Sequence, residues 1–120
     1  MKRTIAGIVL AAVMAVSVAS AAQAAQGVDF EDGNDLYAKC NSPYATMNWF
    51  MCLGYVECIS DALGSGSSIN GYTACMPAGA SAGQAMDVVK QFLTAHPELR
   101  HFIAAGLVAS ALANAFPCQR

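Results

Sequence analysis

Apolar residues recur at helical spacing in three segments of the chain. Between residues 48 and 63 one stripe holds Cys52, Val56, Ile59 and Leu63. Residues 82–95 carry a second stripe, Ala85, Val89 and Phe92, flanked by Met86 and Leu93. A third follows residue 97 with Leu99, Ile103, Leu107, Val108, Leu112 and Phe116. This spacing is typical of helices that bury one face, and no stretch alternates as a strand would.

Local signals mark where these helices begin and end. Ser81 and Gln84 have the spacing of a capping box, in which each side chain bonds the other residue's backbone N–H. Pro97 stops that helix and suits the first turn of the next one, with Glu98 favourably placed near its N-terminus. The Gly/Ser run at residues 64–68 ends the first main helix and opens a loop to about residue 80. With a short helix over residues 35–40, the pattern predicts an all-α bundle of three main helices and a short N-terminal one.

The first 25 residues have the pattern of a secretory signal peptide. Lys2 and Arg3 precede an apolar run at residues 5–18, and Ala22-Gln23-Ala24 offers cleavage after Ala24 or Ala25. A retained membrane anchor is the alternative, although about 20 apolar residues are expected for a bilayer span. Residues 26–34 are acidic and contain glycine, which predicts a mobile leader before one domain at residues 35–120.

Cleavage would change the charge of the chain. The sequence has 6 Lys and Arg and 8 Asp and Glu residues, and Lys2 and Arg3 would leave with the signal, which gives a net charge of about −4. Nucleic acid and anionic membrane surfaces need a basic patch, so neither is expected as a partner.

Five cysteines, Cys40, Cys52, Cys58, Cys75 and Cys118, follow the signal segment. In an exported chain they are expected to pair and to staple a domain with a modest core. There is no C-x-x-C pair, and His96 and His101 lie far from any cysteine in sequence. We therefore expect no metal site and no cofactor.

The spacing of the cysteines limits how they pair. Cys52 and Cys58 are six residues apart on one predicted helix, so they face different directions. A local bridge from Cys40 to Cys52 is within reach, and a bridge from Cys75 to Cys118 would close a long loop, contributing roughly 4 kcal/mol. Cys58 is then left over, most simply as a buried free thiol that packs as a small apolar residue. A reactive or intermolecular thiol is the alternative.

A set of short motifs occurs in a recognisable order along residues 34–118: Asp35-Leu36-Tyr37 before a Cys, Cys52-Leu53-Gly54-Tyr55-Val56, Asp61-Ala62-Leu63, Cys75-Met76-Pro77, Gln84, Val88-Val89, Phe92-Leu93, His96-Pro97-Glu98, Arg100-His101 and Ala115-Phe116-Pro117-Cys118. Together they resemble the Rap/Tai family of immunity proteins, which protect bacteria against amidase toxins of type VI secretion. The resemblance implies a periplasmic, helical, often dimeric protein that blocks the cleft of a peptidoglycan amidase and is not an enzyme.

The family's four framework cysteines fall on Cys40, Cys52, Cys75 and Cys118. Cys58 departs from the family pattern, which commonly has Gly there, and a larger side chain puts close helix packing at that point in question. An exposed loop that enters the amidase cleft is best placed at residues 64–72. Gly66 and Ser68 permit close backbone approach and Asn70 and Tyr72 supply contacts, unless the loop is only a flexible connector.

Other readings of the sequence predict different functions. A nucleophile formed by Cys58 with His96 or His101 would be enzymatic, but nothing marks an oxyanion hole. A small acid-stress chaperone, or an envelope protein without a toxin partner, would share the stapled helical fold. The aromatic cluster Trp49, Phe50 and Tyr55 suits either the core or an interface for a dimer or a toxin.

Overall fold

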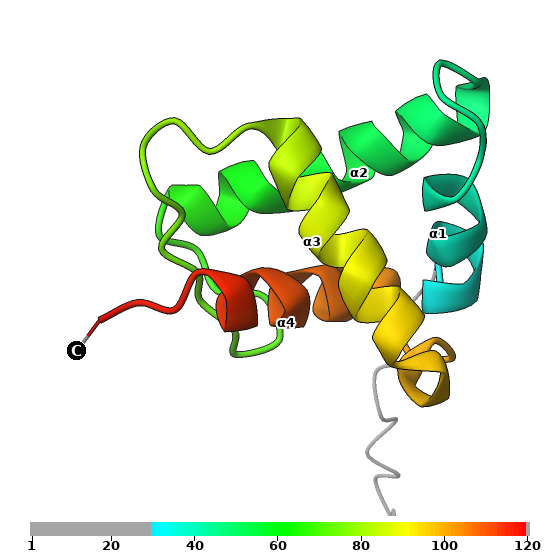
Figure 1. Cartoon of the computed structure of the whole chain (residues 1–120). Coiled ribbons are helices and arrows are strands. Elements are labelled where there is room, and N and C mark those ends of the chain that lie inside the picture. Colours follow the sequence, from blue (N-terminus) through cyan, green and yellow to red (C-terminus); the bar gives the residue numbers. More distant parts are fainter. Residues whose placement is uncertain (1–29, 120) are drawn as a thin grey trace, which may run out of the picture.

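The computed structural model describes residues 30–119, and this part of the chain is helical. Figure 1 shows its elements in order: α1 (Gly33–Cys40), α2 (Met47–Gly64), α3 (Ala82–Ala95), the 3-10 turn η1 (Pro97–Leu99) and α4 (Ala104–Ala115). Within residues 30–119 the extended pairing is limited to two isolated β-bridges. The predicted all-α class, with three main helices and a short N-terminal one, is confirmed.

The predicted signal peptide at residues 1–25 and the first four leader residues, 26–29, lie outside the described residues. Across residues 30–119, each helix is too short or too polar to cross a membrane.

Helix α3 lies across both α2 and α4, and α1 packs beside them (Figure 1). Their contact encloses one core, whose largest fully buried side chains are Leu36, Leu63, Leu93, Leu112, Val56, Val89, Val108, Cys40 and Cys52. The disulfide between Cys40 and Cys52 is part of this core and joins the end of α1 to the first turns of α2. It lies where the sequence allowed a local bridge.

Side chains cap the starts of α2 and α3, and the cap of α3 is the predicted one. Thr46 caps α2, its side chain accepting the Trp49 N–H at 3.4 Å. At α3 the capping box is complete: the Gln84 N–H donates to Ser81 Oγ at 3.2 Å, and the Ser81 N–H donates to Gln84 Oε1 at 2.9 Å. These bonds satisfy donors that the first helical turn leaves without a partner.

One position in each of two predicted core stripes differs from the prediction, and the others are buried as expected. On α3 the fully buried position is Leu93, and Phe92 is half-buried. On α2 the buried face includes Ser60, while Ile59 is half-buried. Burial of Ser60 is tolerated because its hydroxyl donates to the Val56 carbonyl at 2.7 Å.

The prediction for the N-terminal part of the last helix is wrong. A continuous helix was expected from residue 97 to about 116, but the chain leaves helical geometry after η1 and α4 begins only at Ala104. The reason is pairing with a distant segment: the Gly33 N–H donates to the Phe102 carbonyl at 3.0 Å, and the Asn34 N–H to the Arg100 carbonyl at 2.9 Å. A continuous helix would use those carbonyls for its own ladder.

The same pairing places the beginning of the packed domain earlier than expected. The leader was predicted to reach residue 34, yet Glu31 accepts the Ala104 N–H at 3.0 Å and α1 already begins at Gly33. Lys39 also donates to the Glu31 carboxylate at 2.6 Å, with both side chains mostly buried. Residues 31–34 are therefore held against the start of α4.

Arg100 ties α3 to α1. Its Nε donates to the Leu93 carbonyl at 2.6 Å in the last turn of α3, where helix carbonyls lack partners. Its guanidinium lies 3.6 Å from the centre of the Tyr37 ring on α1. This cation–π contact, with the charge near the C-terminal end of the α3 dipole, favours the observed packing.

Candidate partner-binding surface

The loop at residues 65–81 leaves α2 through a glycine-dependent helix end. The Ser67 N–H donates to the Ala62 carbonyl at 3.1 Å and the Gly66 N–H to the Leu63 carbonyl at 3.0 Å. Gly66 has a φ of 92°, the left-handed conformation that this end motif requires. The structure thus places Gly66, a predicted contact residue, at the base of the loop, where its role is to end the helix.

The tip of the loop is a two-residue hairpin. Ile69 and Tyr72 exchange both backbone hydrogen bonds, at 3.1 and 2.9 Å. Between them Asn70 and Gly71 have positive φ angles of 50° and 79°, as a type I′ turn requires. Asn and Gly are the residues that favour this turn, so the tip has a defined conformation. Ser68 is exposed just before it.

This hairpin is seated on α4. A Cβ added to Gly106 would lie 2.4 Å from Asn70 Nδ2, so Gly106 leaves the room that the Asn70 amide occupies. Sequence reasoning missed Gly106. The signal that was available is a glycine inside an Ala-rich helical pattern, which commonly marks close approach of another segment.

A pocket of about 310 Å³ opens between the hairpin and the start of α4. It is lined by Asn70, Tyr72, Leu99, Phe102, Ile103, Gly106, Leu107 and Ser110. Tyr72, Phe102 and Ile103 are large apolar side chains that remain 41–53% exposed. The structure therefore brings together two of the four predicted contact residues, Asn70 and Tyr72. Their apolar neighbours are Phe102, which the sequence did not single out, and Ile103, which was expected on the buried stripe of the last helix but is exposed.

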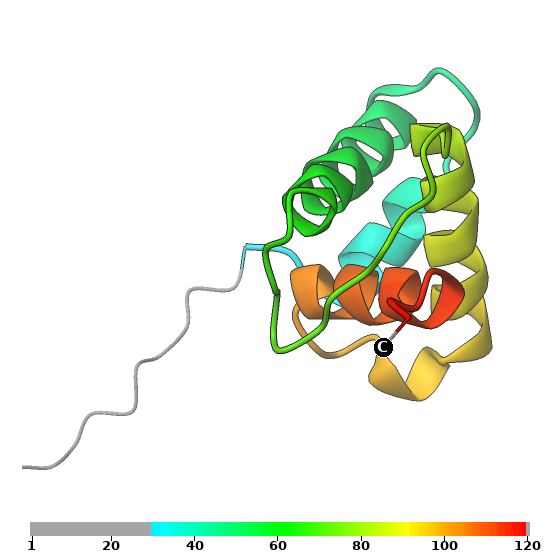
Figure 2. The same cartoon turned by 90° about the vertical axis from the view of Figure 1, so that its left-hand side faces the viewer.

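The second half of the loop is fastened to the C-terminal end of the chain. A disulfide joins Cys75 to Cys118, and the Cys75 N–H donates to the Phe116 carbonyl at 2.8 Å. Figure 2 shows the loop passing in front of α4 before it rises to the start of α3. The loop is therefore attached to the domain at two points, the hairpin on Gly106 and the disulfide at Cys75.

A second exposed apolar surface lies at the corner between α1 and α2. We call it the aromatic patch, and its exposed members are Tyr44, Met47, Phe50 and Met51. Trp49 is half-buried beneath it, with ring centroids 4.8 Å from Tyr44 and 5.1 Å from Phe50. Tyr55 is half-buried against the core. The predicted cluster is therefore divided between core and surface.

With this geometry established, one comparison with known proteins decides the family. The family model of the Rap1a immunity proteins matches residues 32–118. The chain belongs to this family. No curated protein and no solved structure matches it.

Membership of the Rap1a immunity proteins gives the chain its general role. Immunity proteins bind a toxin effector, they are generally not enzymes, and those of this family are typically exported. The match begins at residue 32, close to the point where the chain starts to pack against α4. The whole helical domain is thus the Rap1a unit.

The position of Cys58 differs from the sequence-based expectation. It was expected to be buried, but the free thiol is exposed. The buried face of α2 carries Cys52, Val56 and Ser60, and a residue two positions after Val56 points about 200° away from it. The question of close helix packing at Cys58 does not arise within residues 30–119, because the side chain there is exposed.

The two histidines lie near the 3-10 turn. His96 Nδ1 is 3.1 Å from Glu98 Oε1, and the His101 ring stacks beside Phe102. A hydrogen bond from the residue's own backbone, and then the one with His96, lower the pKa of the Glu98 carboxyl below its ordinary value of 4.5. Within residues 30–119, His, Cys, Asp and Glu side chains form no group of three or more that would hold a metal ion.

Proposed function

We propose that the protein is a periplasmic immunity protein that binds and occludes a peptidoglycan amidase delivered by type VI secretion. The observation that carries this proposal is the family match over residues 32–118, which spans nearly the whole described domain. The proposal adds three things to family membership: the chemistry of the toxin, the compartment and the surface used.

The compartment is supported by the sequence and by the disulfides. We propose that residues 1–25 are a signal peptide cleaved after Ala24 or Ala25, so that the chain folds in the periplasm. Two disulfides support this assignment, because such bonds form and persist in oxidising compartments.

The surface that we propose for toxin binding is the hairpin with its adjoining pocket. Asn70 and Tyr72 are held in one conformation by the turn and by Gly106, so ordering them on binding costs little conformational entropy. Tyrosine beside an apolar pocket is typical of residues that carry binding energy at interfaces. Ser68 is exposed just before the hairpin, and Gly66 ends α2 at the base of the loop, so neither lines the pocket.

Contact between two copies of the chain is a separate part of the proposal. The aromatic patch offers four large apolar side chains that are 48–81% exposed, and burial of such a surface would favour a homodimer. Sedimentation across a concentration series tests it: Phe50→Ser should shift the chain towards the monomer, and Phe102→Ser should leave the association unchanged.

A direct assay tests the toxin assignment. The mature, oxidised protein is mixed with each amidase effector encoded by the same genome, and peptidoglycan hydrolysis is followed together with binding calorimetry. We expect one amidase to lose activity at stoichiometric ratio. If every amidase stays active and unbound, the amidase assignment fails. An acid-stress chaperone, or an envelope protein without a toxin partner, would then be the better hypothesis.

A further inference from the structure

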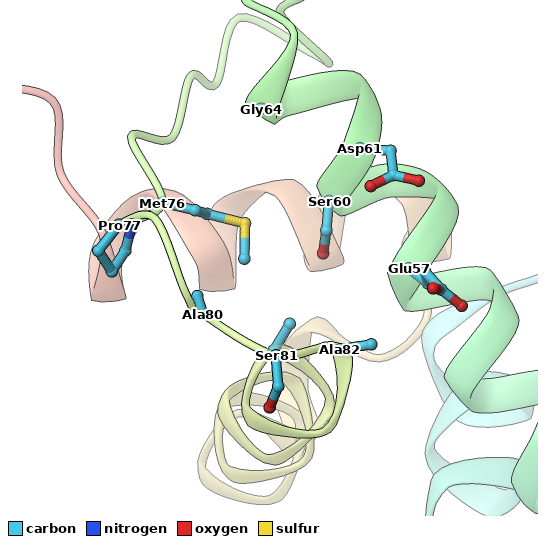
Figure 3. A pocket seen from close by; sticks show the side chains of 10 residues that line it. Glu57, Ser60, Asp61, Gly64, Met76, Pro77, Ala80, Ser81 and Ala82 are labelled. Carbon is cyan, nitrogen blue, oxygen red and sulfur yellow. The ribbon is translucent and has the colours of Figure 1, made fainter.

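A groove of about 340 Å³ runs along the second half of α2, on a different part of the 65–81 loop from the hairpin. One side is built by α2 and the other by the end of the loop and the first turn of α3 (Figure 3). The residues that line it are Glu57, Ser60, Asp61, Gly64, Met76, Pro77, Ala80, Ser81, Ala82 and Ala85. It thus joins one negatively charged wall to one that is mostly apolar.

Within residues 30–119 the two carboxylates of this groove form no ion pair. Glu57 and Asp61 are one turn apart and lie on the α2 side in Figure 3. Among residues 30–119 the ion pairs join Lys39 to Glu31 and His96 to Glu98, and neither involves the groove. The wall opposite the carboxylates carries no charge. In the part of the chain that the structure describes, the groove therefore carries two negative charges without a paired cation.

The other polar groups in the groove already have partners. Ser60 donates to the Val56 carbonyl, and Ser81 and Gln84 bond each other in the capping box. What remains for a ligand is an apolar wall that includes Met76, Pro77 and Ala80, and the two carboxylates on the α2 side (Figure 3). A side chain with an apolar stem and a cationic head matches this combination, because the stem packs while the head stays near charge.

We propose that the groove receives an arginine side chain of the bound partner, which under the proposed function is the toxin. Arginine fits better than lysine because its planar fork bonds carboxylates with two parallel hydrogen bonds and keeps its charge at every relevant pH. The 65–81 loop then offers two contact points: the hairpin at residues 69–72, and the groove beside residues 76–81. Charge at the groove steers the partner and sets its orientation.

A small-molecule titration tests the groove without any toxin. N-acetyl-arginine methylamide is added to the mature, isotopically labelled protein, and backbone amide shifts are followed by NMR. The matched probe is the citrulline derivative, which has nearly the same shape and no charge. We expect saturable shifts at Ser60, Asp61 and Ala80 with arginine only, weakening as salt is raised.

Paired variants locate the effect. Glu57→Gln with Asp61→Asn should lower the apparent affinity for the arginine probe by about fivefold or more. Asp35→Asn with Asp87→Asn makes the same change in net charge at exposed positions outside the groove. This control pair should change the affinity for the arginine probe by less than about twofold. Equal shifts with citrulline, shifts spread over the whole surface, or equal loss in both double variants would overturn the proposal.

The outcomes separate this inference from the proposed function. If no amidase binds while the arginine titration succeeds, the toxin assignment fails and the groove stands as a site for a cationic partner. If an amidase binds and the groove variants leave the rate, affinity and salt dependence of binding unchanged, the groove proposal fails and the hairpin surface stands.

Discussion

The side-chain amide of Asn70 occupies the space above Gly106, where an added Cβ would lie 2.4 Å from Asn70 Nδ2. This contact joins the tip of the loop to α4, two elements that are far apart in sequence. It fixes where Tyr72 stands relative to Phe102 and Ile103 in the pocket. The geometry of the proposed binding surface thus depends on the absence of a side chain at one helix position.

Gly106→Ala should separate binding from stability. Alanine favours the helix by about 1 kcal/mol over glycine, which offsets the strain of displacing Asn70, so the free energy of unfolding should change little. Partner affinity should fall by about tenfold or more because the hairpin moves. Gly54→Ala is the control, since a Cβ there meets nothing within 4 Å. Equal affinity for both variants would show that the hairpin position does not matter.

Gly33→Ala should instead lower stability. An added Cβ would lie 2.7 Å from the Arg100 carbonyl oxygen and 2.4 Å from Leu107 Cδ1, so backbone has to shift. We expect a loss of about 1–3 kcal/mol in the free energy of unfolding, measured by urea denaturation. At the control position, Gly83, the nearest atom is 3.8 Å away, and Gly83→Ala should not destabilise the fold. A neutral Gly33→Ala would contradict the close crossing of α1 over residue 100.

The two disulfides should differ in their reduction. Cys40 and Cys52 are fully buried, whereas Cys75 is exposed and Cys118 half-buried. A soluble dithiol should therefore reduce the loop disulfide first, with each bond taking two electrons from one dithiol. Differential alkylation with mass spectrometry measures the order, and Cys58 should react before any reductant is added. Simultaneous reduction of both bonds would contradict this order.

The lowered pKa of the Glu98 carboxyl, caused first by a backbone hydrogen bond and then by the hydrogen bond with His96, gives a pH dependence with a definite sign. The carboxyl has a lowered pKa in the folded chain, so its contribution to stability is present above pH 4.5 and is lost as the pH falls through the folded value. Glu98→Gln should remove the loss of stability that protonation of this carboxyl causes in acid. Between pH 5 and 8 the free energy of unfolding of the variant should depend on pH in the same way as that of the unmodified chain. Denaturation midpoints at pH 3, 5 and 7 measure it. A steeper loss of stability at low pH in the Glu98→Gln variant than in the unmodified chain would contradict this prediction.

Features of the fold that depend on residues close together in sequence could be predicted, and features that depend on distant residues could not. The capping box of Ser81 and Gln84 and the three apolar stripes depend on residues within one or two turns, and they were predictable. The break before Ala104 was not, because it depends on Gly33 and Asn34 bonding to carbonyls some 70 residues away in sequence. Pattern reasoning reads periodicity along the chain and has no access to such pairing.

The candidate site shows the same division. The Gly-rich loop was found from composition, and Asn70 and Tyr72 do share one surface. Gly66 was assigned to contact, but its position depends on how α2 ends. Cys58 was assigned to the core, although it lies two residues after the buried Val56 and so about 200° round the helix from the buried face. Phe102 and Ile103 entered the site only because the last helix begins late.

The most direct test of the account is survival of cells. A peptidoglycan amidase effector from the same genome is directed to the periplasm of a host, with or without this protein carrying its own residues 1–25. We predict that the intact chain restores growth, that Tyr72→Ala loses protection, and that Tyr44→Ala on the aromatic patch keeps it. Lysis at the same rate with and without the protein, for every amidase effector tested, would contradict the claim that it is an amidase immunity protein.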